Sequence, residues 1–374
     1  MTERAHYDAI VVGGGIVGAA CASELVAARM KVALIEPKVV GGGVTAAGMG
    51  HLAVMDDSEP QFALTRYSQL LWKEMAARLP ADAEYLPCGS IWIAADEEEM
   101  AEVERKRAFY RERDVPAEVL NGRELAAAEP NLRGGLEGGL LLGDDSVVYA
   151  PCAARFLVEE ARRGGLDVVT GRSVTEFGDG AVRLDDGSAM GASVVVLATG
   201  AAAGKMVPGI AIQPRKGHLL ITDRYPGFLR HQLIELGYLK SAHAEDADSV
   251  AFNAQPRMTG QVLIGSSRQY GVEDARVDER MMDPMLRRAM EYLPGLGALS
   301  AIRCWTGFRA ATPDKLPLIG LCPGYRSVYL ATGHEGLGIS TAPGTARLLA
   351  DMILGRDSAI PRGPYLPERR YARV

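Results

Sequence analysis

Three glycines near the N-terminus are spaced to bind a dinucleotide. Gly13, Gly15 and Gly18 follow an apolar run of strand type and open a helical sequence. In such a turn the first glycine permits a tight bend, the second admits a pyrophosphate, and the third lets the helix pack on the strand. The helix N-terminus offers N–H groups and a positive dipole to the phosphates. We therefore predict a dinucleotide site here, which also includes Ile16 and Val17.

A carboxylate stands where such a site needs one. Glu36 ends the next apolar run, residues 31–36, which reads as a buried strand. A carboxylate at this point accepts hydrogen bonds from the ribose hydroxyls of adenosine and would repel a 2′-phosphate, so the pattern disfavours NADP. Strand, turn, helix and acid together indicate a nucleotide-binding unit, and they leave FAD and NAD both open.

A second glycine-rich loop lies near the C-terminus. Gly333, Gly336 and Gly338 precede a helical sequence that we expect to begin near Ser340. The N-terminus of that helix would face whatever fills the loop and would stabilise negative charge there by up to roughly 1–2 kcal/mol. The loop is therefore predicted to face an anionic group.

The sequence contains two kinds of strand pattern, which predict two kinds of sheet to hold these residues. Strand–helix units of the parallel type occur at the start, middle and end of the chain, whereas short alternating strands over 211–265 favour an antiparallel sheet. We predict an α/β fold in which a Rossmann-like nucleotide-binding domain is interleaved with an α+β substrate domain built on an antiparallel sheet. The first domain is expected to comprise residues 1–84, 146–210 and 310–366, and the second residues 85–145 and 211–309. Helices are expected over 59–78, 97–113, 151–163, 278–293 and 340–354.

Composition excludes several classes of protein. The chain has 374 residues, with 41 basic and 47 acidic side chains, and this balance argues against a nucleic-acid partner. No apolar stretch is long enough for a transmembrane helix. The five cysteines form no CxxC pair, which argues against a disulfide framework, a zinc site or an iron–sulfur cluster in this chain, and we expect no metal site. A reducing cytoplasm fits best.

Four motifs, in order along nearly the whole chain, give a family resemblance. They are Ala9–Glu36, Leu197–Gly200, Trp305–Arg309 with Pro313–Pro317, and Ala331–Gly338. With them the sequence resembles the D-amino-acid-oxidase-like FAD-dependent amine oxidoreductases, which include glycine oxidase, sarcosine oxidase and the flavin subunits of hydroxyproline, opine and proline dehydrogenases. The resemblance implies that the nucleotide-binding domain is an FAD-binding domain.

The resemblance also implies which residues hold the FAD. Val174 matches the segment whose backbone holds the adenine, the loop 45–49 matches the segment beside the isoalloxazine ring, and the loop 336–339 matches the segment facing the flavin pyrimidine. Some relatives attach FAD through a cysteine. Here Cys304 lies one position from that site, which falls on Arg303, so we predict non-covalent FAD. The implied contacts are Thr45, Ala46, Ala47, Gly48, Met49, Val174, Ala198, Thr199, Gly200, Arg309, His334, Glu335, Gly336, Leu337, Gly338 and Ile339, together with the N-terminal residues named above.

Three residues are candidates at the substrate end. In relatives the arginine matching Arg309 binds the substrate carboxylate, and a guanidinium can grip a carboxylate with two parallel hydrogen bonds. His51 follows the loop beside the flavin ring and could touch the substrate, as could Tyr238. We nominate no side-chain base, because the flavin carries the hard step and the protein supplies orientation and electrostatics. His334 could touch the flavin ring in the same way.

The predicted reaction is oxidation of the Cα–N bond of an amino or imino acid to the imine. The segments 214–228 and 235–240 look most like hydroxyproline- or opine-type flavin subunits. A D-imino acid such as cis-4-hydroxy-D-proline is therefore the first expectation. Electrons would pass to a quinone or a protein, possible partners being subunits that carry a second flavin and an iron–sulfur centre.

Three other functions stay open. One is a glycine- or sarcosine-type oxidase that forms hydrogen peroxide. Another is an electron-relay subunit without its own substrate, which would have no need of Arg309 as a carboxylate clamp. A flavin hydroxylase is disfavoured because the region 319–323 lacks the acid of its Gly-Asp motif.

Overall fold

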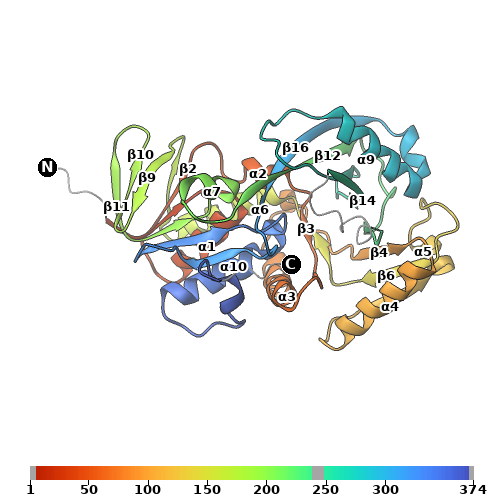
Figure 1. Ribbon diagram of the computed structural model, residues 1–374, viewed down its shortest axis with the longest axis horizontal. Helices are drawn as coiled ribbons and strands as arrows, with labels where there is room; N and C mark the ends of the chain where they lie inside the picture. Colours follow the sequence, from red (N-terminus) through yellow and green to blue (C-terminus); the bar gives the residue numbers. More distant parts are fainter. Residues whose placement is uncertain (1–5, 238–247, 370–374) are drawn as a thin grey trace.

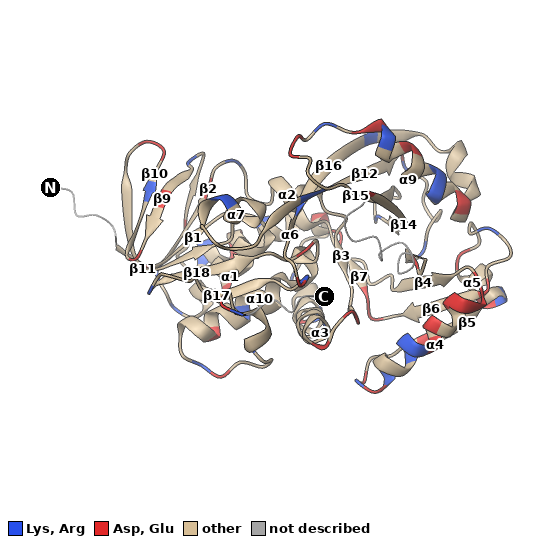
Figure 2. Ribbon diagram, in the orientation of Figure 1, with Lys and Arg blue, Asp and Glu red and all other residues tan. Residues whose placement is uncertain are grey.

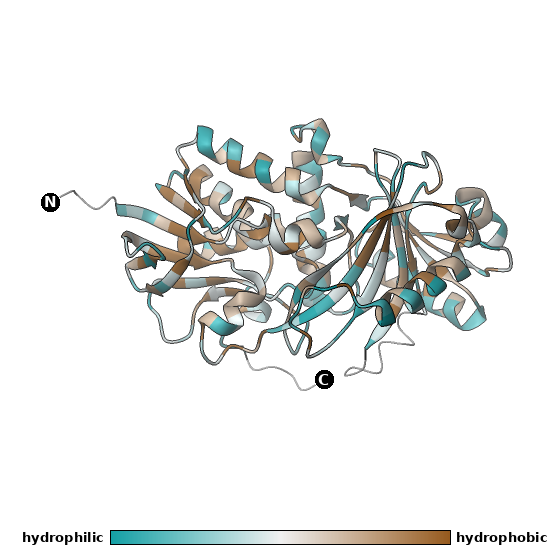
Figure 3. Cartoon of the chain, turned by 90° about the horizontal axis from the view of Figure 1, so that it is seen from above, coloured by the Kyte–Doolittle hydropathy of each residue, from teal (hydrophilic) through white to brown (hydrophobic). Residues whose placement is uncertain are grey.

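In the computed structural model, which describes residues 6–237 and 248–369, the chain forms two lobes side by side. Each lobe is built on its own eight-stranded sheet. The two lobes are seen side by side in Figure 1, and the strands of both sheets carry the most hydrophobic segments (Figure 3). Among the described residues no helix combines the length and the apolar character needed to cross a membrane.

The sheet of the first lobe is mainly parallel. Its strand order is β17-β18-β11-β1-β2-β8, and the antiparallel hairpin β9–β10 extends it from β11. Parallel strands buried on both faces are rich in apolar residues, as β1 and β2 are. The strands are β1 (His6–Val12), β2 (Val32–Glu36), β8 (Asp167–Thr170), β9 (Val174–Gly178), β10 (Ala181–Leu184), β11 (Ala189–Leu197), β17 (Leu318–Leu321) and β18 (Val328–Thr332).

Four long helices pack in this lobe. They are α1 (Ile16–Ala27), α3 (Glu59–Ala76), α6 (Ala150–Arg163) and α10 (Gly338–Ile353), and α1 contacts both α6 and α10. The residues 18–23 of α1 are all small, which lets this part of the helix approach its neighbours closely. Ser58 caps α3 by accepting a hydrogen bond from the N–H of Gln61. Helix α10 begins at Gly338, slightly earlier than predicted.

The sheet of the second lobe is mainly antiparallel. Its order is β16-β12-β15-β14-β13-β4-β6-β5, with only β13 and β4 parallel to each other. Helix α9 (Glu279–Tyr292) covers β14 and β15. The strands are β4 (Ser90–Ala94), β5 (Glu118–Asn121), β6 (Gly138–Leu142), β12 (Gln213–Thr222), β13 (Gln232–Glu235), β14 (Ser249–Pro256), β15 (Val262–Arg268) and β16 (Ala301–Ala311).

Smaller elements complete the fold. The strands β3 (His51–Leu52) and β7 (Ser146–Val147) form a two-stranded sheet. The short helices are α2 (Gly43–Ala47), α5 (Gly122–Ala128) and α7 (Ala203–Met206), with 3-10 turns at Ala81–Ala83, Gly200–Ala202, Pro294–Ala298 and Gly363–Tyr365. Helix α4 (Glu97–Arg111) carries acids and bases along its length (Figure 2), as expected of a solvated helix.

The architecture confirms the predicted α/β fold with two multi-strand sheets. Strands of the first sheet come from the start, middle and end of the chain, and strands of the second come from the stretches between them. The predicted domain boundaries stay a prediction. One strand, β16, runs through the expected boundary between residues 309 and 310 without a break.

Candidate active site

The N-terminal glycine turn is closed by contacts that no other residue type would permit. A Cβ on Gly18 would lie 1.8 Å from the carbonyl oxygen of Gly13. A Cβ on Gly13 would lie 2.5 Å from the carbonyl oxygen of Ala198, and Gly13 has a φ of +105°, which favours glycine. Both close approaches hold the start of α1 against β1 and against the turn after β11.

Glu36 is held in place by the backbone of the turn. One carboxylate oxygen accepts a hydrogen bond from the N–H of Gly14 at 2.7 Å, and the other accepts from the N–H of Lys38 at 2.9 Å. A Cβ on Gly14 would also lie 3.0 Å from the Cβ of Glu36. Gly14 was not singled out from the sequence, although it sits inside the motif. A carboxylate has further lone pairs, so Glu36 can still accept from a ribose hydroxyl.

The segment 45–49, predicted as a loop, forms the end of the short helix α2 and the two residues after it, and it contacts both lobes. Thr45 accepts a hydrogen bond at Oγ1 from the N–H of Ile16 at 2.9 Å, which ties the loop to the start of α1. From the second sheet, Trp305 Nε1 donates to the carbonyl of Ala47 at 3.3 Å, and Gln255 Nε2 donates to the carbonyl of Met49 at 2.8 Å. The same loop therefore contacts the glycine turn and the second sheet.

The loop before α10 lies against both the glycine turn and His51. A Cβ on Gly338 would lie 3.6 Å from Cγ2 of Val17. Ser340 Oγ donates to the carbonyl of His51 at 2.7 Å. His334 is buried, with Nε2 at 3.1 Å from Oγ1 of Thr345. These contacts bring the first helix, the loop 45–49 and the last helix to one place at the edge of the first sheet.

Apart from Glu335, which is ion-paired with Arg215, two predicted site residues have a buried polar atom without a hydrogen-bond partner in the described part of the chain. These atoms are Nε2 of His51 and Oγ1 of Thr199. Burial lowers the pKa of His51 and of His334 to about 4, so both imidazoles are neutral at neutral pH. A buried polar atom normally has a partner, so His51 and Thr199 are suited to contact a bound group.

The side chain of Arg309 occupies a space that two glycines leave open because they have no side chain. A Cβ on Gly217 would lie 2.5 Å from Nη1 of Arg309, and a Cβ on Gly336 would lie 3.1 Å from its Cδ. Nη1 donates to the carbonyl of Ser267 at 3.0 Å. Burial, and next the charge of Arg215, lower the pKa of Arg309 to about 10, so its guanidinium stays charged at neutral pH.

Besides Arg303 further along β16, two more arginines share the face of the sheet that carries Arg309, and we call the part around Arg309 the arginine face. Arg215 stands opposite Arg309 in the β12–β16 register. Its guanidinium forms an ion pair with Glu335 and donates to the hydroxyl of Tyr270 at 3.2 Å. Arg268 is the third, and burial together with the charges of Arg215 and Arg309 lowers its pKa to about 10. The arginine face is thus defined by Arg215, Arg268 and Arg309.

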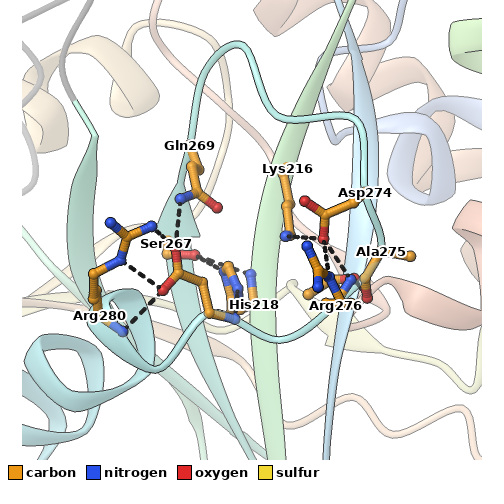
Figure 4. A network of polar contacts seen from close by, with 10 residues as sticks. Lys216, His218, Ser267, Gln269, Asp274, Ala275, Arg276 and Arg280 are labelled. Carbon is orange, nitrogen blue, oxygen red and sulfur yellow. Dashed lines mark hydrogen bonds and ion pairs between the residues drawn. The ribbon is translucent and has the colours of Figure 1, made fainter.

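The opposite face of the same strands holds a separate polar network (Figure 4). His218 Nδ1 lies 2.8 Å from Oγ of Ser267, and Nε2 accepts from the N–H of Asp278 at 3.0 Å, at the start of α9. Nδ1 therefore carries the ring proton and donates to Ser267. Lys216, fully buried, lies 3.5 Å from Asp274. Because this lysine points away from Arg309, it is not part of the arginine face.

The remaining predicted residues lie at the rim of the first sheet or outside the described residues. Val174 begins β9 and is half-buried. The segment 198–200 follows β11 and contacts the glycine turn through Ala198. Tyr238 lies outside the described residues. The structure therefore brings together the predicted residues of the loops 13–18, 45–49, 198–200 and 334–339, with Arg309 and His51 beside them.

The site fits an extended dinucleotide with a flavin. The glycine turn would hold the pyrophosphate at the start of α1, and Glu36 would hold the ribose. His51, Thr199 and the N-terminus of α10 would contact the ring end, where α10 favours negative charge. Cys304 alternates with Arg303 and Trp305 along β16, so it points away from the face that carries Trp305 and Arg309. Among the described residues no cluster of histidine, cysteine or acidic side chains is arranged to hold a metal ion.

Sequence reasoning missed three residues that position Arg309 or lie beside it. Gly217, Ser267 and Arg268 have no motif of their own, and their relation to Arg309 depends on the pairing of three strands. The available signal was alternation: in β12, Arg215 and Gly217 must share one face, and His218 must lie on the other. Alternation predicts which face of the sheet a residue of β12 lies on, but not which residue of a neighbouring strand it contacts.

Comparison with known proteins gives one family and a consistent group of relatives. The family model for FAD dependent oxidoreductases matches residues 8–352. Glycine oxidase from Geobacillus kaustophilus is 28% identical, over 100% of this chain and 99% of its own. The hydrogen cyanide synthase subunit HcnC from Pseudomonas protegens is 27% identical, over 97% and 96%. The crystal structure of the Geobacillus kaustophilus glycine oxidase superposes with a TM-score of 0.87 at 27% identity and covers 98% of this chain and 100% of its own. The chain therefore belongs to the family of FAD dependent oxidoreductases, which the four sequence motifs had indicated.

Proposed function

We propose that the protein oxidises the Cα–N bond of an amino acid whose carboxylate is bound by Arg309, in a reaction of the glycine oxidase type. The observation that carries this proposal is the position of Arg309, a charged guanidinium fixed between Gly217 and Gly336 beside the loop that begins α10. A pure electron relay would not need such a clamp. The relatives named above favour the glycine oxidase alternative over the cyclic D-imino acid that segments 214–228 suggested.

The chain's own residues bind and orient the substrate. Arg309 would receive the carboxylate, and the contact with Ser267 fixes the orientation of the guanidinium before substrate arrives. His51 is neutral and could accept or donate one hydrogen bond without adding charge. When bound, FAD would supply the redox chemistry by accepting two electrons and one proton from the substrate.

The overall reaction balances with oxygen and water. The amino acid loses a hydride from Cα, which is one proton with two electrons, and a proton from the nitrogen to give the imine, and water hydrolyses the imine to an oxo acid and ammonia. Oxygen takes up the two electrons and two protons as hydrogen peroxide. A quinone or a protein partner could take the same electrons, and that choice is tested separately below.

Anaerobic flavin bleaching tests the proposal. Glycine, sarcosine, both enantiomers of alanine and proline, and cis-4-hydroxy-D-proline would be added one at a time to the purified holoprotein. Bleaching by an amino acid, with Arg309→Leu abolishing it at full FAD content, is the expected result. No bleaching by any of them would refute a reaction of the glycine oxidase type and favour a relay subunit. Readmitted air separates the acceptors, because an oxidase recolours at once with formation of peroxide.

A further inference from the structure

The strand β15 carries one extra residue next to Arg309. Leu220 of β12 pairs with Ile264 of β15, whereas Lys216 pairs with Gln269, so three residues of β12 face four residues of β15 between these pairs. Such an extra residue is a bulge, which interrupts the ladder of hydrogen bonds and changes the direction of the groups beside it. The bulge therefore decides which groups of β15 are available to Arg309.

Ser267, inside the bulge, contacts β12 with its side chain instead of its backbone. The N–H of Lys216, on the edge of β12 that faces β15, donates to the backbone carbonyl of Gln269. The N–H of His218 lies on the same edge, but it donates to Oγ of Ser267 at 3.0 Å. The carbonyl of Ser267 accepts a hydrogen bond from Nη1 of Arg309 at 3.0 Å. Ser267 therefore binds β12 with its hydroxyl and Arg309 with its carbonyl.

The imidazole of His218 holds the same hydroxyl. Nε2 of His218 accepts from the N–H of Asp278 at 3.0 Å, and Nδ1 lies 2.8 Å from Oγ of Ser267 (Figure 4). A neutral imidazole carries one ring proton, so this proton is on Nδ1 and is donated to Ser267. Burial, and next the charge of Lys216, lower the pKa of His218, so the ring is neutral at neutral pH. The backbone and the side chain of His218 thus donate to one oxygen atom.

Asp278 brings the start of helix α9 into the same set of contacts. Its carboxylate caps α9 by accepting from the N–H of Arg280, and it also accepts from Nε2 of Gln269 at 3.0 Å. The side chains of His218 and Ser267 belong to residues that are only 1% exposed, and a buried donor or acceptor that loses its partner is costly. These hydrogen bonds therefore connect α9, on one face of the sheet, to Arg309 on the other.

We propose that His218 is a positioning residue for substrate binding, which fixes the direction of the Arg309 guanidinium through Ser267. This inference rests on the proposed function, in which Arg309 binds the substrate carboxylate. His218 does not touch the substrate. A guanidinium that is anchored at Nη1 offers its remaining N–H groups in one orientation. Loss of the contact between His218 and Ser267 should therefore weaken carboxylate binding, whereas loss of the contact with Asp278 alone should not.

Two substitutions at position 218 each keep one of the two imidazole contacts. Asparagine places its amide nitrogen where Nδ1 lies, so His218→Asn can still donate to Ser267 but does not reach Asp278. Glutamine places its amide one bond further, where Nε2 lies, so His218→Gln can still accept from Asp278 but removes the donor to Ser267. Thr306→Val is the matched control. Thr306 pairs with His218 across β12 and β16, and its hydroxyl donates to the carbonyl of Ala275 at 2.8 Å.

The readout is the affinity of the purified holoprotein for acetate and propionate, followed by the flavin absorbance. We expect His218→Gln and Ser267→Ala to weaken binding by about 3- to 10-fold, the effect of one hydrogen bond. His218→Asn should keep most of the affinity, and Thr306→Val should keep all of it. In the Ser267→Ala background, His218→Gln should add no further loss. With an amino acid that bleaches the flavin, the same variants should raise KM by the same factor and change kcat little.

The other patterns contradict the proposal. If His218→Asn weakens binding and His218→Gln does not, His218 acts by anchoring α9. Equal losses in both variants with a lowered Tm show a structural role only. If neither variant at position 218 folds, Ser267→Ala decides, and an unchanged affinity refutes the proposal.

Arg309→Leu separates this proposal from the proposed function. If the wild type binds neither acid, or if Arg309→Leu binds both equally well, the proposed function and this inference fail together. If Arg309→Leu loses binding but the variants of His218 and Ser267 do not change it, only this inference fails and the proposed function stands.

Discussion

A methyl group at position 217 should displace Arg309 without disturbing the fold. In Gly217→Ala the new Cβ would lie 2.5 Å from Nη1 and 3.0 Å from both Cζ and Nη2 of Arg309. Non-bonded heavy atoms prefer about 3.5–4.0 Å, so the guanidinium must move by about 1 Å. The contact involves the flexible end of a side chain, and Gly217 does not have a positive φ, so alanine adds no backbone strain.

The kinetic cost of that shift should be large. A movement of about 1 Å in a positioning group can cost roughly 100-fold in rate, and loss of one hydrogen bond to a charged group costs about 1.5–3 kcal/mol. We therefore expect kcat/KM for the amino acid substrate to fall by about 10- to 100-fold, mainly through KM. FAD content and Tm should stay close to the wild-type values, because no backbone atom has to move.

Two comparisons make this prediction refutable. Gly178→Ala, at the end of β9, places its Cβ where nothing lies within 4 Å, and it should leave the kinetics unchanged. In an Arg309→Lys background, Gly217→Ala should have little further effect, because the guanidinium that it displaces is gone. An unchanged KM in Gly217→Ala, or a full additional loss in the Arg309→Lys background, would refute the role given to Gly217.

Three further predictions concern the cofactor and the core. Gly18→Ala would force a Cβ to within 1.8 Å of the Gly13 carbonyl oxygen, so we expect a lower Tm and little FAD in the purified protein, measured by absorbance. Burial raises the pKa of Asp145 to about 7, so the unfolded state ionises first, and wild-type stability should fall as pH rises from about 4 to 7. In urea unfolding, the loss of unfolding free energy between pH 5 and pH 8 should be smaller by a few kcal/mol in Asp145→Asn than in the wild type. The same loss in both proteins would contradict this. Because Cys304 points away from the arginine face, acid precipitation should release all of the flavin to the supernatant, and a yellow pellet would show a covalent bond.

The cofactor half of the site was predictable because its geometry is local. Gly13 and Gly15 stand between β1 and α1, Gly18 lies in the first turn of α1, and the close contact between Gly18 and Gly13 spans only one turn. Glu36 follows on the neighbouring strand and returns to the same turn through Gly14. Short-range contacts of this kind leave a pattern that a sequence displays directly. The loop at 336–339 could be predicted for the same reason, since its helix follows at once.

The substrate half depends on strand pairing that spans long stretches of chain. Gly217 and Gly307 lie opposite each other on β12 and β16. Leu220 pairs with Ile264 but Lys216 pairs with Gln269, so β15 carries one extra residue, a bulge, and only for that reason does Arg268 lie on the arginine face. A register change of one residue would turn Arg268 to the side of α9. The local sequence of β15 contains no pattern that predicts this bulge. Alternation could predict which residues of one strand share a face, but not which residues of another strand they meet.

Arg309 fits its position because one residue of each lobe beside it is a glycine, which has no side chain. Gly217 belongs to the second sheet and Gly336 to the loop that begins α10 in the first lobe, and each leaves space for a different part of the same arginine. The loop 45–49 ties the lobes together at the same place through Thr45 and Trp305. A substrate carboxylate on Arg309 would thus be fixed relative to both lobes at once. The orientation of substrate against the cofactor then depends on the contact between the lobes, so substitutions at Gly217 and Gly336 should lower kcat/KM more than the loss of any one contact within a lobe.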